Sequence, residues 1–154
     1  MSGLAGLKFA DDIIKLLSDK WRPGSGGKRP TFSKAWRTKT VNVGTNSDEN
    51  IIVMLDSDNP NIFSLQYKDA DSNPIFDWLH DLSVSLDVRT GKSEDRVEQM
   101  VDEVYRILKT NVAAPTVNNR QYVQLLPGQA QPMLEDFKNY FRYVVDVEAM
   151  RLNP

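Results

Sequence analysis

The feature that most constrains the fold is a strict alternation of side-chain character from Trp78 to Arg89. One phase carries Trp78, His80 and four aliphatic residues, whereas the other carries mainly Ser, Asp and Arg. Successive side chains of a strand point to opposite faces, so the run predicts a strand with one face on a core and the other in water. His80 lies on the apolar phase, which favours a partly buried, hydrogen-bonded histidine over a catalytic one.

Two other segments repeat their apolar residues every three or four positions, as amphipathic helices do. The first runs from Leu7 to Trp21 and ends before Pro23, because the residue before proline avoids helical geometry. The second runs from an N-cap at Ser93 to Lys109, with acidic residues in its first turn. Four charged residues of the first helix are assigned to its solvent face: Asp11, Asp12, Lys15 and Asp19.

The remaining strand candidates are weaker. Turn-forming residues at 56–61 predict a hairpin between the apolar runs 51–55 and 62–68. Pro127 predicts the end of a strand over 121–126. Further candidates lie at 38–43 and 141–149. The predicted order, roughly α-β-β-β-α-β-β, indicates one α+β domain over residues 1–154, in which two main helices pack on a mixed or antiparallel sheet.

The charge of the chain is segregated along the sequence. Of 19 basic and 21 acidic residues in total, nine basic and three acidic ones fall within residues 1–40. The first part therefore has a net charge of +6 and the remainder −8, and no acid lies between Lys20 and Lys39. This asymmetry indicates a charged partner or self-association of unlike patches. The simpler interpretation is that residues 22–40 form a basic flexible loop or arm on a mildly acidic domain.

Several classes of protein are excluded. No apolar run approaches the ~20 residues of a membrane span, and the first residues lack the pattern of a secretory leader. Without cysteine there is no disulfide, thiolate zinc site or thiol nucleophile, and one histidine cannot build a polyhistidine site. The Gly91-Lys92-Ser93 triplet is not a phosphate-binding loop, because Leu86 stands where that loop needs a glycine. We expect no catalytic residue, no metal and no cofactor.

One enzymatic alternative stays open, a metal-dependent nuclease of the PD-(D/E)xK type. Asp56 and Asp58 end one predicted strand, and Gln66 and Lys68 end the next. Such an arrangement can hold a divalent cation beside a lysine that supports an attacking water. The predicted order of elements is also similar to the core of that superfamily. Against it, an amide is a weaker metal ligand than a carboxylate, and the aspartates also fit a solvated turn.

A second alternative is a nucleic-acid-binding module that uses the basic segment 20–39. Trp21, Phe32 and Trp36 lie between lysines and arginines there, and such a combination is typical of single-strand binders. The simpler interpretation has Trp21 complete the first helix and Trp36 pack over the core, while the cations are solvated.

The overall layout points to a known family. A strand with leucine and valine at alternate positions over 82–90 ends in threonine, the helix that follows ends in Ile107-Leu108, and an aromatic strand spans 140–147. This pattern resembles the tail-terminator, or tail-completion, proteins of long-tailed bacteriophages and tailed archaeal viruses. The resemblance covers roughly residues 4–150.

The resemblance implies a structural protein without enzymatic activity. It would form a ring, usually a hexamer, at the head-proximal end of the tail tube, where it ends tube polymerisation and joins the tail to the head connector. The implied partners are further copies of the chain, the tail-tube protein, the connector proteins and the DNA that passes through, with no membrane. The implied location is the tail or neck of the virion, after assembly in the host cytoplasm.

Candidate interface residues follow from the segregated charge. A basic arm that meets an acidic body makes a heterologous contact, the kind that closes into rings. We expect the following residues at a subunit or connector interface: Lys28, Arg29, Lys34, Trp36 and Arg37. We expect the complementary surface or the lumen to be acidic: Asp77, Asp81, Asp87, Asp146 and Glu148.

Overall fold

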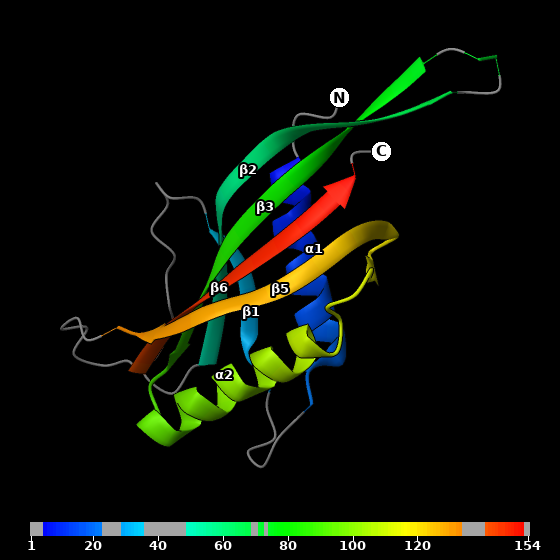
Figure 1. Cartoon of the computed structure of the whole chain (residues 1–154). Helices are drawn as coiled ribbons and strands as arrows, with labels where there is room; N and C mark the ends of the chain where they lie inside the picture. The colour runs from blue at the N-terminus through cyan, green and yellow to red at the C-terminus, as the bar shows by residue number, and fades with distance from the viewer. Residues whose placement is uncertain are drawn as a thin grey trace.

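A computed structural model of the chain describes residues 5–22, 29–35, 49–68, 71–72, 74–133 and 141–152. These residues form two helices and six strands (Figure 1). In chain order they are α1 (Ala5–Lys20), β1 (Thr31–Ala35), β2 (Glu49–Lys68), β3 (Pro74–Thr90), α2 (Glu94–Lys109), β4 (Thr116–Val117), β5 (Arg120–Pro132) and β6 (Phe141–Leu152). The predicted α+β class is confirmed, with one more strand after α2 than the sequence indicated.

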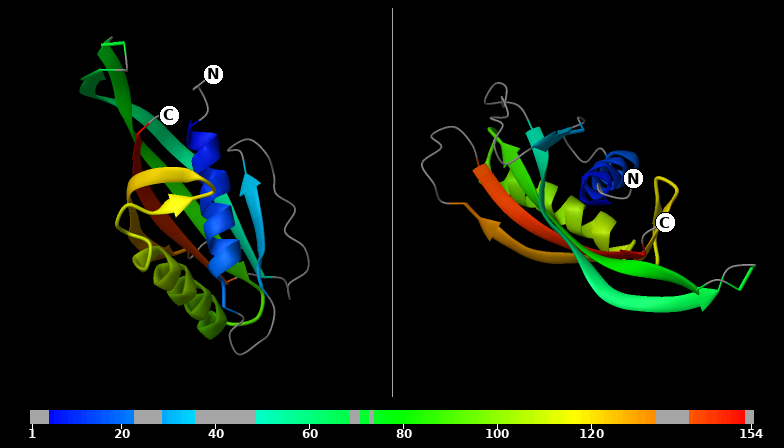
Figure 2. Two further views of the ribbon diagram at one scale, coloured as in Figure 1. Left: turned by 90° about the vertical axis from the view of Figure 1, so that its right-hand side faces the viewer. Right: turned by 90° about the horizontal axis from the view of Figure 1, so that it is seen from above.

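The six strands form a single mixed sheet in the order β1-β2-β3-β6-β5-β4. Only β1 and β2 run parallel, and the other neighbours are antiparallel. The alternating segment is the central strand β3, which pairs with β2 on one side and β6 on the other. The sheet is curled, and both helices lie on its concave face (Figure 2).

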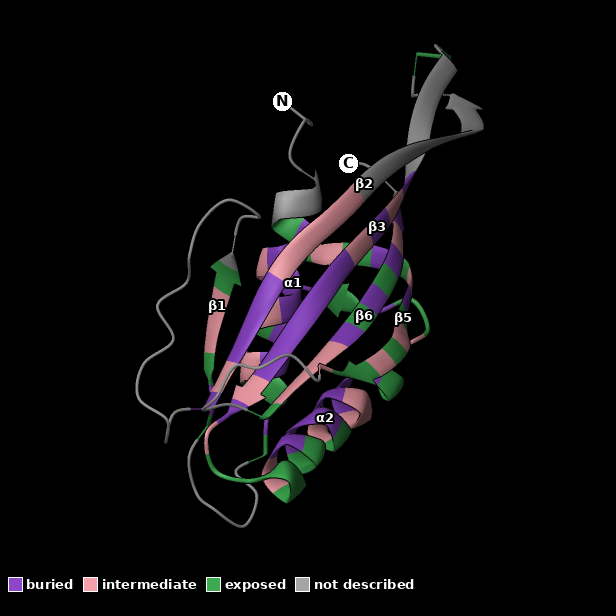
Figure 3. Ribbon diagram, turned by 90° about the vertical axis from the view of Figure 1, so that its left-hand side faces the viewer, coloured by how far each residue is buried: buried purple, intermediate pink, exposed green. Residues whose placement is uncertain are grey.

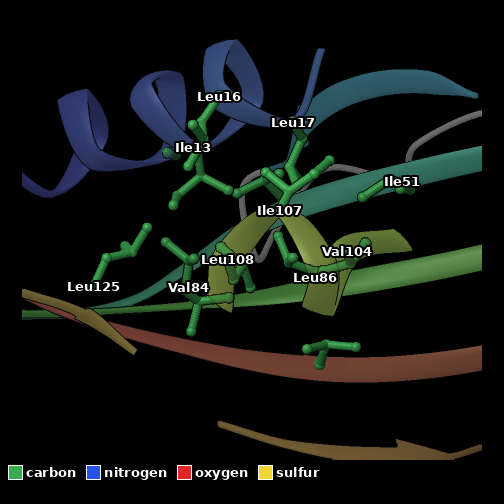
Figure 4. Close-up of a cluster of buried hydrophobic side chains, with 14 of the residues drawn as sticks. Ile13, Leu16, Leu17, Ile51, Val84, Leu86, Val104, Ile107, Leu108 and Leu125 are labelled. Atoms are coloured by element: carbon green, nitrogen blue, oxygen red, sulfur yellow. The ribbon is translucent and has the colours of Figure 1, made fainter. Parts of the chain in front are cut away.

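The hydrophobic core fills the space between the helices and the concave face. The apolar phase of β3 enters it as the alternation predicts, and Leu82, Val84, Leu86 and Val88 are all buried. Burying one such side chain stabilises a fold by about 1.5–3 kcal/mol. Figure 4 shows how α1 and α2 meet over this strand, with the following side chains around Val84 and Leu86: Ile13, Leu16, Leu17, Val104, Ile107 and Leu108.

Both predicted helices are present with nearly the predicted bounds. Ser93 is the N-cap of α2, since its side chain accepts a hydrogen bond from the backbone N–H of Arg96. α1 ends at Lys20, just before the buried Trp21. Neither helix has the length and apolar character that a membrane crossing would need. The assignment of Asp12 to the solvent face of α1 was wrong, because its carboxylate is buried.

The predicted turn at 56–61 is wrong, since β2 continues through it as one long strand paired with β3. Register shifts between Leu55 and Ser57 and between Asn61 and Leu65 absorb the turn-forming residues as bulges. The missing N–H of Pro60 is tolerated because the pairing of β1 with β2 ends at Met54. The runs 51–55 and 62–68 are therefore parts of one strand rather than two arms of a hairpin.

Two further differences concern the edges of the sheet. β5 does not end at Pro127; it passes through a register shift there and runs on to Pro132. The basic segment 22–40 contains a strand, β1, where the sequence indicated a flexible loop. The strand candidate at 38–43 lies outside the described residues.

Candidate functional site

The face of the sheet turned away from the helices, which we call the open face, carries the polar phase of β3 and β6. Figure 3 views the sheet from this side, with α1 behind the strands. The open face holds three of the five predicted acidic residues in its exposed or half-buried part: Asp81, Asp146 and Glu148. Asp77 belongs to β3, and its side chain lies outside the described part of the structure.

A hydroxyl group sits between two carboxylates on this face. Ser85 Oγ lies 2.5 Å from Asp56 Oδ2 and 3.2 Å from Asp146 Oδ1. Asp56 reaches Ser85 because it is the extra residue of the first β2 bulge, between the pairs Leu55–Val84 and Ser57–Ser83. A serine hydroxyl has one hydrogen, so it donates to one of the two carboxylates at a time. Two carboxylates therefore share one hydroxyl donor near the centre of the open face.

Next to this site the open face is hollowed into a groove of about 240 Å³. Its polar lining includes the carboxylate residues Asp81 and Glu148, and Leu126 and Met150 supply apolar surface. The groove crosses four adjacent strands, with the full lining Ser57, Asp81, Leu82, Ser83, Gln124, Leu126, Glu148, Ala149 and Met150. Asp81 and Glu148 are 67 residues apart in the sequence, and the fold brings both to the lining of this groove.

The predicted residue Asp87 does not belong to an exposed acidic surface. Its side chain is fully buried, and it makes ion pairs of 2.5 Å with Arg89 and 2.7 Å with Arg142. Two guanidinium groups offset the cost of taking one carboxylate out of water. Asp87 therefore stabilises the pairing of β3 with β6, and the exposed part of the acidic surface lies farther along the strands, toward Asp81.

The basic candidates are divided by the structure. Arg29 and Lys34 are exposed on and beside β1, and Lys34 Nζ lies 2.8 Å from Asp11 Oδ1 on α1. Lys28, Trp36 and Arg37 lie outside the described residues. Trp21 is buried and contacts Phe32 edge-on, with 5.7 Å between ring centroids. Trp21 is therefore a core residue, as the simpler interpretation of the aromatic residues in segment 20–39 predicted.

The four candidate nuclease residues are not brought together. Asp56, Asp58, Gln66 and Lys68 all lie on β2, whereas the hypothesis needed them on two adjacent strands. Ten residues of strand separate Asp56 from Gln66 in sequence, or roughly 30 Å at the usual rise per residue. Within the described part of the chain, no three His, Asp or Glu side chains are placed to hold a metal ion. The geometry that motivated a nuclease is thus absent.

A buried polar cluster that the sequence did not predict lies on the helix-covered face of the sheet, at the same end as the groove. Asp12 accepts hydrogen bonds from Arg120 at 2.7 Å, from Asn118 at 3.3 Å and from the hydroxyl group of Tyr122. Arg151 approaches the same carboxylate at 3.7 Å. Burial raises the pKa of Asp12, and these donors act in the opposite direction. The cluster joins α1 to β5 and β6, and its groups are mostly paired with one another, which is typical of a structural role.

No family model matches the sequence, and no curated protein matches it. The fold is similar to that of a chain in a solved structure described as the virion of a native gene transfer agent (GTA) particle. The TM-score is 0.56 at 14% identity, and the likeness covers 94% of this chain and 94% of that chain. A second solved chain is more distant, with a TM-score of 0.47 and 12% identity over 94% of this chain and 96% of the other. At such low identity the first likeness defines a shared fold.

Proposed function

We propose that this chain is a structural protein of a tailed, phage-like particle. The observation that carries the proposal is the likeness to a chain of a gene transfer agent virion, which extends over 94% of both chains. A fold shared from end to end supports a shared type of role better than a common motif would. The sequence resemblance to tail-terminator proteins points independently in the same direction.

In the finer form of the proposal, the chain forms a ring, most simply a hexamer, at the head-proximal end of the tail tube. The ring ends tube polymerisation and joins the tail to the head connector. Its partners are further copies of the chain, the tail-tube protein and the connector proteins. The distribution of charge supports a ring, because the exposed Arg29 and Lys34 lie beside and on the edge strand β1, whereas the exposed acids Asp146 and Glu148 lie on β6. Patches of opposite charge at different places on the surface favour head-to-tail contacts between copies of the chain.

The proposal assigns no enzymatic activity to the chain. It is supported by the separation of the four nuclease candidates along β2 and by the structural partners of Asp12 and Asp87. Incubating the purified chain with DNA and Mg²⁺ or Mn²⁺ tests this part. DNA cleavage that is lost in Lys68→Ala would contradict a purely structural role.

Native mass spectrometry of the purified full chain tests the ring. The proposal predicts one dominant oligomer of defined stoichiometry at low salt, with dissociation as the salt concentration rises, because screening weakens contacts between exposed charges. A chain that stays monomeric at high protein concentration and low salt would contradict the proposal.

A further inference from the structure

The strands β2 and β3 run on together past the end of the rest of the sheet (Figure 1). Among the described residues, β1 pairs with β2 only as far as Met54, and β6 pairs with β3 only from Leu79 onward. Residues 62–68 and 74–78 therefore form a two-stranded extension, which we call the ribbon. At the usual rise per residue the ribbon reaches roughly 20 Å beyond the part of β3 that β6 supports.

The ribbon is rich in apolar residues for a segment of only two strands. Seven of its twelve residues are aliphatic or aromatic: Ile62, Phe63, Leu65, Tyr67, Ile75, Phe76 and Trp78. Two strands alone bury little apolar surface, and such a unit is marginally stable in water unless a third strand or another surface packs against it. The ribbon therefore requires a packing partner beyond its own two strands.

The register divides the ribbon into two faces of different character. Residues directly opposite each other in an antiparallel pair share a face, and so do alternate residues of one strand. One face, which we call the apolar ribbon face, has a single acid at the end nearest the sheet and consists of Leu65, Tyr67, Ile75 and Asp77. The other face is half polar and consists of Gln66, Lys68, Pro74 and Phe76. The first face is the better suited to a contact with another apolar surface.

A matching apolar surface lies beside the groove of the open face. Among the described residues, three large hydrophobic side chains are exposed, Val123, Leu126 and Phe141. Leu126 lines the groove, and Val123 adjoins the lining residue Gln124, whereas Phe141 lies at the opposite end of β6 from the lining residue Met150. Val123 and Leu126 both belong to β5, which is two strands away from β3 in the sheet.

The chain thus carries an apolar projection and an exposed apolar surface at different places. The ribbon projects from the body of the fold (Figure 2), so it can reach a neighbouring molecule. A contact between two different places on identical copies is head-to-tail, and contacts of this kind close into rings. A second copy of the chain therefore supplies both halves of the contact without any further partner.

Packing of faces suits this contact better than addition of the ribbon to the edge of the sheet. Past the short pairing with β4, the outer edge of β5 contains Pro127 and Pro132, which have no N–H group to donate. The carbonyl oxygen of Gly128 already accepts a hydrogen bond from Tyr105. Two prolines and an occupied carbonyl group protect this edge against a further strand.

We propose that the apolar ribbon face packs over Val123 and Leu126 of a second copy of this chain. The inference rests on the proposed function and names the contact between neighbours in the ring. Tyrosine combines a large apolar ring with a hydroxyl group, and the groove lining offers hydrogen-bonding groups at Ser83 and Gln124 for Tyr67 of the incoming ribbon. Aromatic residues of this kind supply much of the binding energy at protein interfaces.

Polar substitution in the full chain tests this contact. Ile75→Ser on the ribbon and Leu126→Ser beside the groove are each expected to raise the protein concentration for half-maximal assembly by about tenfold or more. The matched controls are Gln66→Ser on the other face of the ribbon and Phe141→Ser at the far end of β6, and both should assemble like the wild type. Analytical ultracentrifugation gives the assembly curves, and circular dichroism checks that each variant is folded.

Because the chain contains no cysteine, cross-linking provides a second test, of position. A variant with both Ile75→Cys and Leu126→Cys is treated with a short bismaleimide reagent, which joins two thiol groups. A head-to-tail contact between these positions gives a ladder of covalent oligomers that ends at the size of the ring, whereas either single variant gives dimers at most. The control combines Ile75→Cys with Phe141→Cys and should give no ladder.

The wild-type assembly curve separates this contact from the proposed ring. If the wild type forms rings but both serine variants assemble like it, the ribbon contact is overturned and the ring stands. If the wild type is monomeric at every concentration, both proposals are overturned. A folded double-cysteine variant that assembles but gives no ladder overturns the pairing of the ribbon with β5. Weaker assembly of both serine variants together with the ladder, and with the controls unchanged, supports it.

Discussion

The hydroxyl group of Tyr122 on β5 donates a hydrogen bond to the carboxylate of Asp12 on α1, where both side chains are only about 1% exposed. Burial is the largest influence on both groups, and it raises the pKa of Asp12 and that of Tyr122. Arg151, itself buried, lies 3.3 Å from the tyrosine hydroxyl group and stands over the tyrosine ring. This cluster ties the first helix of the chain to the last two long strands.

Tyr122→Phe is expected to lower the free energy of unfolding by about 1–3 kcal/mol, because it leaves part of a buried carboxylate without its donor. Urea unfolding followed by circular dichroism measures the change. Tyr143→Phe is the matched control, because the hydroxyl group of Tyr143 makes only a long contact of 3.5 Å with Glu98 near the surface. The control is expected to change stability by less than about 0.5 kcal/mol. Equal changes in the free energy of unfolding for the two variants would contradict a stabilising role of the Asp12 cluster.

The parts of the fold that the sequence predicted are those specified by local pattern. β3 was visible because its apolar and polar residues alternate without a break, and α2 because a capping serine precedes its apolar stripe. The long β2 was missed, because Asp56, Asn59 and Pro60 have turn propensity that pairing with β3 overrides. The sequence did contain a signal for the short hairpin of β4 and β5, namely the pair Asn118-Asn119. Asparagine tolerates the positive φ that a two-residue turn requires, and both residues adopt it.

Glu49 at the start of β2 provides a prediction about pH. Its buried carboxylate accepts hydrogen bonds of 2.6 and 2.9 Å from the guanidinium group of Arg96, and Lys92 Nζ lies 3.1 Å away. The hydrogen bond from Arg96 is the main reason why the pKa of Glu49 is lowered from its ordinary value of 4.5. Because the pKa of Glu49 is lowered in the folded state, its charge stabilises the fold above pH 4.5. This stabilisation is lost as the pH falls through the folded-state pKa.

Glu49→Gln is therefore expected to destabilise the fold by about 1.5–3 kcal/mol at neutral pH, the range for hydrogen bonds that involve charged groups. The difference from the wild type should shrink as the pH falls below 4.5. Denaturation curves at a series of pH values measure it. Asp102→Asn, at an exposed position of α2, is the control and should show little effect at any pH. A difference for Glu49→Gln that stays constant with pH would contradict the assigned role of its charge.

Gly128 gives a third prediction, because the β5 bulge brings it against the backbone of β6. A Cβ atom at this position would lie 2.9 Å from the carbonyl oxygen of Asp146. The carbonyl oxygen of Gly128 also accepts a hydrogen bond of 2.7 Å from the hydroxyl group of Tyr105 on α2. Gly128→Ala is expected to cost about 1–3 kcal/mol, because backbone must move to admit the methyl group.

Thermal unfolding measures the effect of Gly128→Ala, with Gln129→Ala as the control at the exposed neighbouring position. The account predicts a lower melting temperature for Gly128→Ala alone. Unchanged stability in that variant would mean that β5 and β6 approach each other less closely than described.

The candidate site was predictable in its charge and less so in its geometry. Acidic residues of the alternating strand were expected at a complementary surface or lumen; Asp81 lines the groove with Glu148, and its role at an interface stays a prediction. Asp87 follows the same alternation, yet it is buried, because Arg142 arrives from a strand 55 residues away. Asp12 fits the solvent face of an isolated helix, and its burial is explained by partners distant in sequence, among them Tyr122 and Arg120 of β5. Partners distant in sequence decide which charges stay exposed.

We propose that the chain is a ring-forming structural protein of a tailed particle. Electron microscopy of the purified full chain at low salt tests it most directly. The account predicts closed rings of uniform diameter with a central opening and rotational symmetry, most simply sixfold. Isolated monomers at every protein concentration, or open filaments without closure, would contradict it.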